Sequence, residues 1–191
     1  AQPDSKYALD YVYGYRCADS RQNAFFNSTG QAVYMTAALG VVLDPTSNTQ
    51  KFFGGGEVEN THKNTANDMN HHTNDVMAVA ISSDRQTAVS GQVGSSPTMF
   101  TWDATTGQKK QRFKLPKGAR GISAVALSQD GSLAACVDLH NEHNLHVFET
   151  ASGSCILKEK ADTNKVHDVC FSQQPGSSAI CTAGVKHIYF W

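Results

Sequence analysis

The sequence predicts an all-β fold of the propeller type, in which each repeated unit, or blade, is a sheet of four short antiparallel strands. Three segments of the chain repeat the same order of apolar runs and turns. Two columns of large apolar residues keep nearly one period over these copies, with spacings of 43 to 46 residues. A period of about 40–45 residues is typical of a propeller blade. The first column holds Ile81, Leu127 and Phe171, and the second holds Trp102, Phe148 and Trp191.

Short apolar runs bounded by turn residues divide each copy into strands. In the copy that begins at His72, the turn "SDRQ" follows the first run and "ATTGQ" precedes the fourth. The copy that begins at Ala119 has the same order, with the turns "QDGS" and "TASGS". No amphipathic helical pattern competes with this interpretation. The predicted strands cover residues 76–82, 87–91, 99–103 and 109–113 in the first copy, and 123–128, 133–138, 144–149 and 155–160 in the second.

Residues 24–53 follow the same order less closely. "NSTGQ" and "DPTSN" have turn chemistry, and Leu43 and Asp44 stand where Trp102 and Asp103 stand in the next copy. The last copy ends in "YFW" without an outer strand. We therefore expect a portion of a longer protein, about four blades of a larger propeller, with apolar faces exposed on the terminal blades. The expected segments are 1–23 before the blades, 24–53 as a divergent blade, 54–71 as a polar loop, 72–117 and 118–163 as blades, and 164–191 as an incomplete blade.

Composition argues against several functional classes. The 191 residues are 40% hydrophobic and 17% charged, with a net charge of −1. A nucleic-acid binder normally carries a clear basic excess, so we expect no nucleic-acid partner. No run of 18 apolar residues is present, which predicts no membrane-spanning helix, and "AQPDSKYALD" holds no apolar core of a signal peptide. Five cysteines without a CxxC pair are interpreted as reduced thiols of an intracellular protein, mostly packed as small apolar side chains.

Eight histidines invite a metal hypothesis. "HNEHNLH" spaces His140, His143 and His146 three apart, with Glu142 among them, and on a helix such spacing clusters ligands. Here the segment is predicted as a hairpin that enters a strand, so the histidines need not converge. We favour a polar hairpin with His146 on a solvent-facing strand position, and we expect no metal and no cofactor.

Catalytic patterns are weak. "KVHDVC" holds His167, Asp168 and Cys170, but on a strand His167 and Asp168 point to opposite faces. No G-x-S-x-G elbow and no phosphate-binding G-x-x-x-x-G-K-[ST] loop occurs. We therefore expect no enzymatic activity and no small-molecule substrate, while a metal-dependent enzyme that uses His140 and His146 stays as the third hypothesis.

The stretch "DYVYGYR" alternates tyrosine with Val12 and Gly14, a period of two that is typical of a strand. Two interpretations are open for its tyrosines: a clasp that packs on the propeller, which we favour because large rings are costly to leave in water, or a partner surface. Gly14 permits close backbone approach, and Arg16 is placed to pair with Asp10 or Asp19. The tyrosines are Tyr11, Tyr13 and Tyr15.

The repeat resembles the WD-repeat family. "HTNDVMAVAISSD", the "SG" at 90–91 and "TWD" at 101–103 carry the likeness, although Phe148 and Glu149 replace Trp-Asp in the second copy. The resemblance implies a hydrogen-bond network of His72, Ser90 and Trp102 that stiffens the blade. Elementary chemistry agrees, because a buried imidazole and indole N–H need partners, and a hydroxyl on the adjacent strand supplies one.

The N-terminal residues sharpen this likeness. "YVYGYR", then "ADSR" with Arg21, then Asn23 and an aromatic pair resemble the hydrophobic EMAP-like protein (HELP) motif of the echinoderm microtubule-associated protein-like (EMAP-like) family. "CVDLHNEHNLHVFE" and "AGVKHIYFW" are also similar to that family. The resemblance implies a tandem of two fused propellers, and a non-enzymatic protein that binds tubulin, microtubules or axonemal proteins in the cytoplasm, on the cytoskeleton and, in some members, in cilia or flagella.

One basic stretch is a candidate contact with the acidic microtubule lattice, although a solvated strand edge explains it as well. A generic WD-repeat scaffold of a signalling, trafficking or ubiquitin-ligase complex is the alternative function, because a fold does not fix a function. The stretch consists of Lys109, Lys110, Arg112, Lys114, Lys117 and Arg120.

Overall fold

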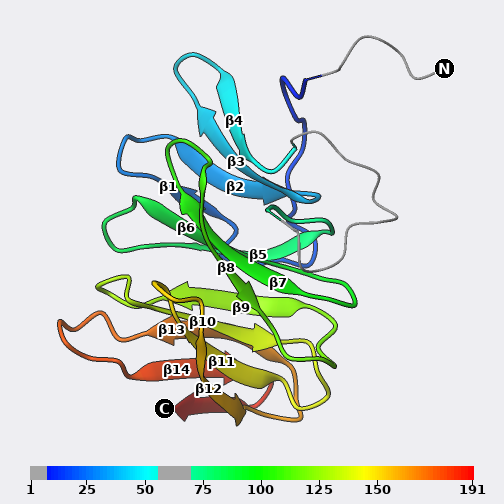
Figure 1. Ribbon diagram of the computed structural model, residues 1–191, viewed down its shortest axis with the longest axis vertical. Coiled ribbons are helices and arrows are strands. Elements are labelled where there is room, and N and C mark those ends of the chain that lie inside the picture. The colour runs from blue at the N-terminus through cyan, green and yellow to red at the C-terminus, as the bar shows by residue number, and fades with distance from the viewer. Residues whose placement is uncertain (1–7, 56–69) are drawn as a thin grey trace.

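A computed structural model describes residues 8–55 and 70–191, and these residues form fifteen strands in four antiparallel sheets, without a helix (Figure 1). Each sheet is built from strands that follow one another in the sequence, so each is one blade. This confirms the all-β, partial propeller fold. The first sheet holds, in order, β1 (Ala24–Phe26), β2 (Ala32–Thr36), β3 (Leu39–Asp44) and β4 (Thr49–Phe53).

The second and third sheets repeat this meander. Their strands fall on the apolar runs of the repeat, which confirms the predicted strands. The second sheet holds β5 (Val76–Ile81), β6 (Thr87–Gln92), β7 (Thr98–Asp103) and β8 (Lys109–Lys114). The third holds β9 (Ile122–Leu127), β10 (Leu133–Asp138), β11 (Asn144–Glu149) and β12 (Cys155–Lys160).

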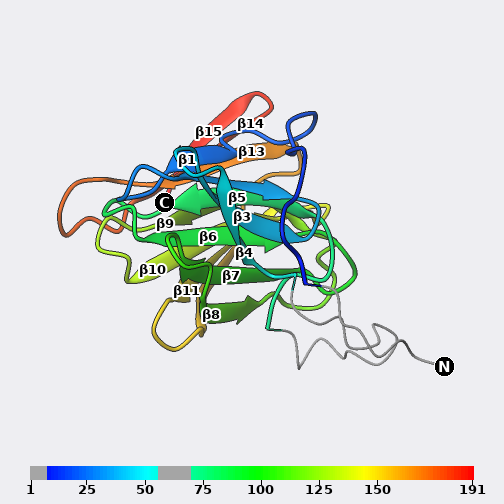
Figure 2. The same cartoon turned by 90° about the horizontal axis from the view of Figure 1, so that it is seen from above.

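The fourth sheet has three strands: β13 (Val166–Phe171), β14 (Ile180–Gly184) and β15 (His187–Phe190). Apolar side chains on its third strand, β15, are exposed, with Phe190 at 82% and Ile188 at 63%. Within residues 8–55 and 70–191 the four sheets do not close into a ring (Figures 1 and 2).

The blades stack in chain order, and their first strands β5, β9 and β13 pack side by side (Figures 1 and 2). The core is therefore layered, with apolar clusters between neighbouring blades: two between the first and second, and one at each of the next two junctions. Between the first two blades, Phe53 stacks on Trp102 with the rings 5.5 Å apart and nearly parallel. Between the second and third blades, Phe113 packs against Phe148. Burial of these faces explains why the strands are apolar on both sides.

Acidic residues close the turns of successive blades by the same chemistry. Asp103 accepts hydrogen bonds from the backbone N–H groups of Thr105 and Thr106, and Asp44 does the same for Thr46 and Ser47. An Asp that accepts from the backbone two or three residues later stabilises a tight turn. The turns are thus set by local sequence.

The alternation in "DYVYGYR" predicted a strand, which is wrong: residues 8–23 contain no regular strand, because their backbone is held by side chains of the first blade instead of a sheet ladder. The predicted polar loop at 54–71 lies mostly outside the described residues. None of the described residues belongs to a helix long and apolar enough to cross a membrane.

Candidate interaction surfaces

The N-terminal segment, residues 9–23, runs over one side of the first blade and reaches the second. Val12 is held by two hydrogen bonds with the Gln50 side chain, at 2.8 and 3.0 Å. Tyr11 donates its hydroxyl to Asn48 at 3.0 Å, and the Arg16 backbone donates to the Met35 carbonyl. These contacts attach the segment to β2, β4 and the turn between β3 and β4. The placement rests on polar contacts to residues far away in sequence.

Arg16 links this segment to the second blade. Its guanidinium binds Asp19 through two short hydrogen bonds, at 2.7 and 2.6 Å, and reaches Asp75 at 3.2 Å. The hydrogen bonds between the two side chains raise the pKa of Arg16 and lower the pKa of Asp19, because they stabilise both charged forms. The carbonyl of Arg16 accepts from buried Asn23. Of the two predicted carboxylate partners, the structure brings Asp19 to Arg16.

The three tyrosines differ in their surroundings. Tyr15 meets Tyr34 of β2 edge-on, with ring centres 6.3 Å apart, and its hydroxyl donates to Asn23. Tyr11 is partly buried. Tyr13 packs against the Tyr11 ring, with ring centres 4.9 Å apart, and is 86% exposed. Gly14 between them has a φ of +88°, a backbone conformation that glycine adopts freely. The segment is therefore attached by Tyr11, Tyr15 and Arg16, while Tyr13 faces solvent.

The end of the segment reaches the meeting point of the first strands. Ser20 donates to the Met77 carbonyl of β5 at 2.9 Å, and Gln22 donates to Asp168 of β13 at 3.3 Å. A cavity of about 250 Å³ lies here, lined by Arg21 and Gln22 together with residues of β5, β9 and β13. Burial raises the pKa of Asp168. The segment thus contacts the first, second and fourth blades.

The structure brings His72, Ser90 and Trp102 together. Ser90 Oγ lies 2.7 Å from His72 Nε2 and 3.0 Å from Trp102 Nε1. An indole N–H can only donate, so the Ser90 hydroxyl accepts from Trp102 and gives its own hydrogen to His72. Burial lowers the pKa of His72 to about 4, so the ring is neutral at pH 7. Its Nδ1–H then donates to Gln92 Oε1 at 2.9 Å.

The sequence analysis did not identify Gln92, which accepts the last hydrogen bond of this network. It also did not identify Asp138, which takes the position of Gln92 in the next blade. Asp138 stands 46 residues after Gln92, the spacing of the Trp102 and Phe148 column, and this spacing was the available signal. Asp138 is buried and accepts from His146 Nε2 at 2.8 Å. The expectation that His146 faces solvent is therefore wrong: both faces of β11 are covered, by the fourth blade at Leu145 and Val147 and by the second blade at Phe148, and the His146 side chain is fully buried.

The other two histidines of this hairpin contact different groups. His140 Nδ1 accepts from the Glu142 backbone at 3.4 Å, and His143 Nδ1 lies 3.2 Å from the Asp162 carbonyl. With His146 turned toward Asp138, the three rings have three different partners. Within residues 8–55 and 70–191, no group of three or more His, Cys, Asp or Glu side chains is placed to hold a metal ion.

His167, Asp168 and Cys170 of "KVHDVC" lie on β13. A bulge between Val166 and Asp168 interrupts the ladder at His167. The hydrogen bonds of Asp168 are with Gln22 and with the backbone N–H of Val169. Burial raises the pKa of Cys170, which disfavours a thiolate nucleophile.

The basic stretch follows β8 and the connection to β9 and does not form one patch. Lys109 donates to Asn70 at 2.5 Å, and Arg120 donates to the Leu139 carbonyl and to Asn141 Oδ1. Lys114 and Lys117 are exposed, and Arg112 is partly buried. Their positive charge is therefore spread along the outer edge of the second blade.

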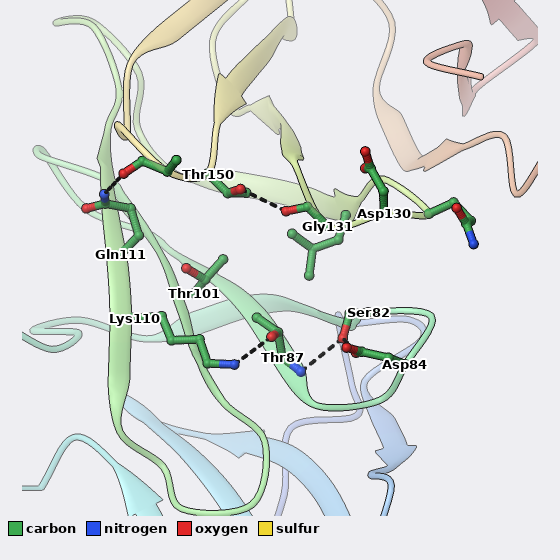
Figure 3. A pocket seen from close by; sticks show the side chains of 12 residues that line it. Ser82, Asp84, Thr87, Thr101, Lys110, Gln111, Asp130, Gly131 and Thr150 are labelled. Carbon is green, nitrogen blue, oxygen red and sulfur yellow. Dashed lines mark hydrogen bonds between the residues drawn. The ribbon is translucent and has the colours of Figure 1, made fainter. Parts of the chain in front are cut away.

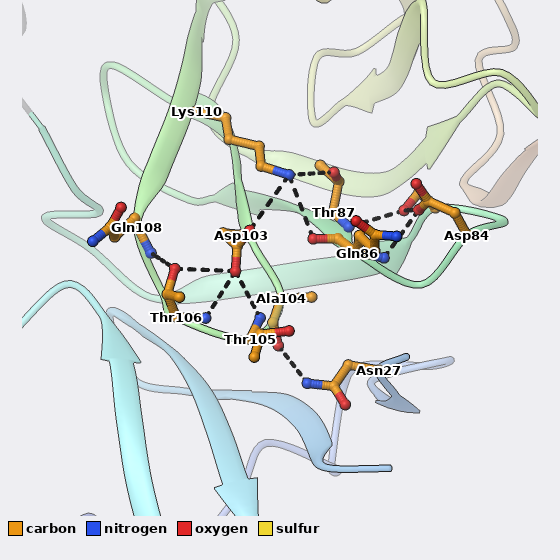
Figure 4. Close-up of polar contacts among 11 residues, drawn as sticks. Asn27, Asp84, Gln86, Thr87, Asp103, Ala104, Thr105, Thr106, Gln108 and Lys110 are labelled. Carbon is orange, nitrogen blue, oxygen red and sulfur yellow. Dashed lines mark hydrogen bonds and ion pairs between the residues drawn. The ribbon is translucent and has the colours of Figure 1, made fainter. Parts of the chain in front are cut away.

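Lys110 belongs instead to the turns at one end of the second blade (Figure 4). Its ammonium donates to Thr87 Oγ1 at 2.7 Å and lies 3.7 Å from Asp103. Burial raises the pKa of Asp103, but the turn hydrogen bonds and Lys110 outweigh burial and hold the pKa below its ordinary value. Asn27 of the first blade donates to the Ala104 carbonyl at 2.8 Å. The residues at and next to Trp102 and Asp103 therefore contact the first blade, through the Phe53 ring and through Asn27.

A polar cavity of about 470 Å³ lies between the second and third blades (Figure 3). Thr101 and Gln111 line one side, and Asp84 and Asp130 lie on another. Hydrogen bonds from Ser128 and Ser132 lower the pKa of Asp130 to about 2, so it is ionised at pH 7. The cavity offers hydroxyl, amide and carboxylate groups, which suit a polar side chain of a partner protein better than an apolar ligand.

The remaining landmarks have separate roles. Phe148 is fully buried, whereas Glu149 is exposed and accepts from Ser152 at 2.6 Å. Trp191 donates its indole N–H to Thr182 Oγ1 at 3.0 Å, which repeats the contact between Trp102 and Ser90 in another blade.

Comparison with known proteins agrees with this architecture. The HELP motif family matches residues 2–41. The chain is 46% identical to the ciliary WD repeat-containing protein ctxp80 of Euplotoides octocarinatus, over 99% of this chain and 26% of the relative. It is 32% identical to echinoderm microtubule-associated protein-like 3 of Mus musculus, over 99% of this chain and 21% of the relative. Mouse echinoderm microtubule-associated protein-like 2 is 29% identical, with 28% of its length covered.

Blades of four strands, a Trp-Ser-His network and an attached N-terminal motif define a HELP-motif protein with a WD-repeat propeller fold. Over 99% of its length the chain is similar to EMAP-like proteins and to a ciliary WD-repeat protein, which agrees with the resemblance that its N-terminal residues predicted. It spans about a quarter of the length of the curated relatives that it matches.

Proposed function

We propose that this chain is part of a non-enzymatic microtubule-associated protein that uses its propeller blades as a rigid platform on tubulin or on the ciliary lattice. The observation that supports this most is likeness over 99% of the chain to a ciliary WD-repeat protein and to echinoderm microtubule-associated protein-like proteins. The protein belongs, on this proposal, to the cytoskeleton and the axoneme.

The geometry supports a platform built for protein contact. The N-terminal segment is attached to three blades, yet it leaves the Tyr13 ring in solvent. Exposed tyrosine on a rigid backbone is a common anchor of protein interfaces, because it buries a large area at low entropic cost. The exposed lysines of the basic stretch give a second contact that suits an acidic surface.

The test is co-sedimentation of the full-length protein with microtubules, with three variants. Tyr13→Ser is expected to weaken binding and leave the melting temperature unchanged, since the ring is 86% exposed. Tyr15→Ser is expected to lower the melting temperature, since its ring contacts Tyr34 and its hydroxyl binds Asn23. Replacement of Lys114 and Lys117 by Gln is expected to weaken binding most at low salt.

Lys158→Gln is the matched control for the lysines, because it is also exposed on the outer strand of a blade, β12. If the full-length protein does not pellet with microtubules, alone or with axonemal extract, the proposed function is wrong. If it pellets and Tyr13→Ser binds like the unmodified protein, the function stands and this surface is not the contact.

A further inference from the structure

Two cysteines occupy directly opposed positions in the fourth sheet. Cys170 on β13 is the register partner of Cys181 on β14. The hydrogen bond from Ser172 N to the Ala179 carbonyl, at 2.8 Å, fixes this register next to the connection between the strands. Residues directly opposite in an antiparallel pair point to the same face of the sheet. The two thiols are therefore neighbours.

The spacing of opposed strand positions is compatible with a disulfide. Opposed residues have Cα atoms about 4.5 or 5.5 Å apart, depending on the type of pair. Disulfides span Cα distances of about 4.4–6.8 Å, so both pair types fall within reach. Their Cβ atoms, about 4.5–5.5 Å apart in a strand pair, must approach to about 3.5–4.5 Å. The bond therefore needs only a local closing of the two strands.

The pair lies on the face of the fourth sheet opposite to the one that packs on the third blade. Val169 and Phe171, the neighbours of Cys170, are buried toward the third blade, whereas Cys170 is exposed and Cys181 is partly exposed. The other cysteines have no cysteine at the opposed strand position. Cys136 stands opposite His146 and Val125, Cys155 stands opposite Phe148, and Cys17 lies outside the sheets. Among the five cysteines, this pair alone is arranged for an intramolecular cross-link.

We propose that Cys170 and Cys181 form a reversible cross-strand disulfide when the protein meets a peroxide. One thiolate attacks hydrogen peroxide, which gives a sulfenic acid and hydroxide. The opposed thiol then displaces water from the sulfenic acid and forms the S–S bond. In sum, two thiols and one peroxide give one disulfide and two waters, so the cysteines are oxidised and the peroxide is reduced.

The surroundings favour a slow and reversible reaction. Burial raises the pKa of Cys170, and the nearby Cys181 thiol and Asp168 carboxylate raise it further, so little thiolate exists at pH 7. A pair that must close slightly to form the bond yields a strained disulfide, which thiol reductants open readily. This suits a protein of a reducing compartment, where disulfides are mostly transient.

The test is treatment of the full-length protein with hydrogen peroxide, followed by alkylation and peptide mass spectrometry. One tryptic peptide, residues 166–186, contains both cysteines, and cleavage after Phe171 by chymotrypsin separates them. We expect this peptide to lose two hydrogens and escape alkylation, its two chymotryptic halves to stay linked, and dithiothreitol to restore both thiols. The rate is expected to rise with pH between 7 and 9, as thiolate forms.

Two variants and a control decide the assignment. Cys170→Ser and Cys181→Ser are each expected to abolish the cross-link, whereas Cys155→Ser, on the exposed outer strand of the third blade, is expected to keep it. The proposal is overturned if both cysteines stay fully alkylated after peroxide while Cys17 and Cys155 oxidise. It is also overturned if Cys170 and Cys181 are found linked to other cysteines in the folded protein.

Discussion

Gly107 lies against the backbone of Phe52, so that a Cβ at Gly107 would come within 2.5 Å of the Phe52 carbonyl oxygen. Gly107 sits in the turn between β7 and β8 of the second blade, and Phe52 lies on β4, the outer strand of the first. Gly153 repeats this contact against Arg112, one blade later. The recurring turn glycine is therefore a point of close approach between blades.

Gly107→Ala is expected to destabilise the protein more than Gly30→Ala. Both residues have a positive φ, +75° and +81°, which costs an alanine about 1–2 kcal/mol. A Cβ at Gly30 meets no atom within 4 Å, whereas at Gly107 it would collide with backbone, an overpacking that adds about 1–3 kcal/mol. Melting temperatures of the two variants measure the difference. Equal losses would show that this glycine serves only its own turn.

Ser90→Ala is expected to lower stability by about 2–4 kcal/mol, because it leaves both the Trp102 N–H and the His72 Nε2 buried without a partner. Chemical denaturation measures the loss. Ser83→Ala is the control, since Ser83 is exposed and its hydroxyl donates to the Gln173 side chain. A loss no greater than that of the control would mean that water or a rearranged side chain replaces the hydroxyl.

His72 is expected to make the folded state less stable in acid. Above pH 6.5 the ring is neutral in both folded and unfolded chains and adds no pH dependence. Below that value the unfolded chain binds a proton that the folded chain, with a His72 pKa of about 4, does not bind. Stability should fall by roughly 3 kcal/mol between pH 6.5 and 4. His72→Asn, compared with the parent over this range, should show a flatter curve, and parallel curves would contradict the assignment.

Asp138→Ala is expected to cost about 3–5 kcal/mol, because it removes the acceptor for His146, for the Asn144 side chain and for the backbone of residues 140 and 144. Asp138→Asn should cost less, since its amide oxygen keeps part of these bonds. Glu142→Gln is the control, because its pair with Lys160 is exposed and solvent screens the attraction between the two charges. Thermal unfolding of the three variants in parallel measures the loss of stability of each. A larger loss for Glu142→Gln than for Asp138→Ala would refute this account.

Much of the fold was predictable because its signals are local. Apolar runs such as residues 76–82 and turns such as that closed by Asp103 depend on neighbours a few residues away. The blade period then followed from the spacing of Trp102 and Phe148. His146 was misplaced because alternation indicates two faces of a strand but does not say that both are buried. That depends on a neighbouring blade on each side.

The sequence by itself determined the strands, their grouping into blades and the HELP-like identity of the N-terminal residues. Only the tertiary structure decided how these parts meet: the attachment of residues 9–23 through Gln50 and Asp75, the exposure of Tyr13, and the opposition of Cys170 and Cys181. The physical reason is the distance along the sequence between the residues that interact. Strands and turns arise from propensities within a few residues, whereas these contacts join segments that come together only when the blades pack.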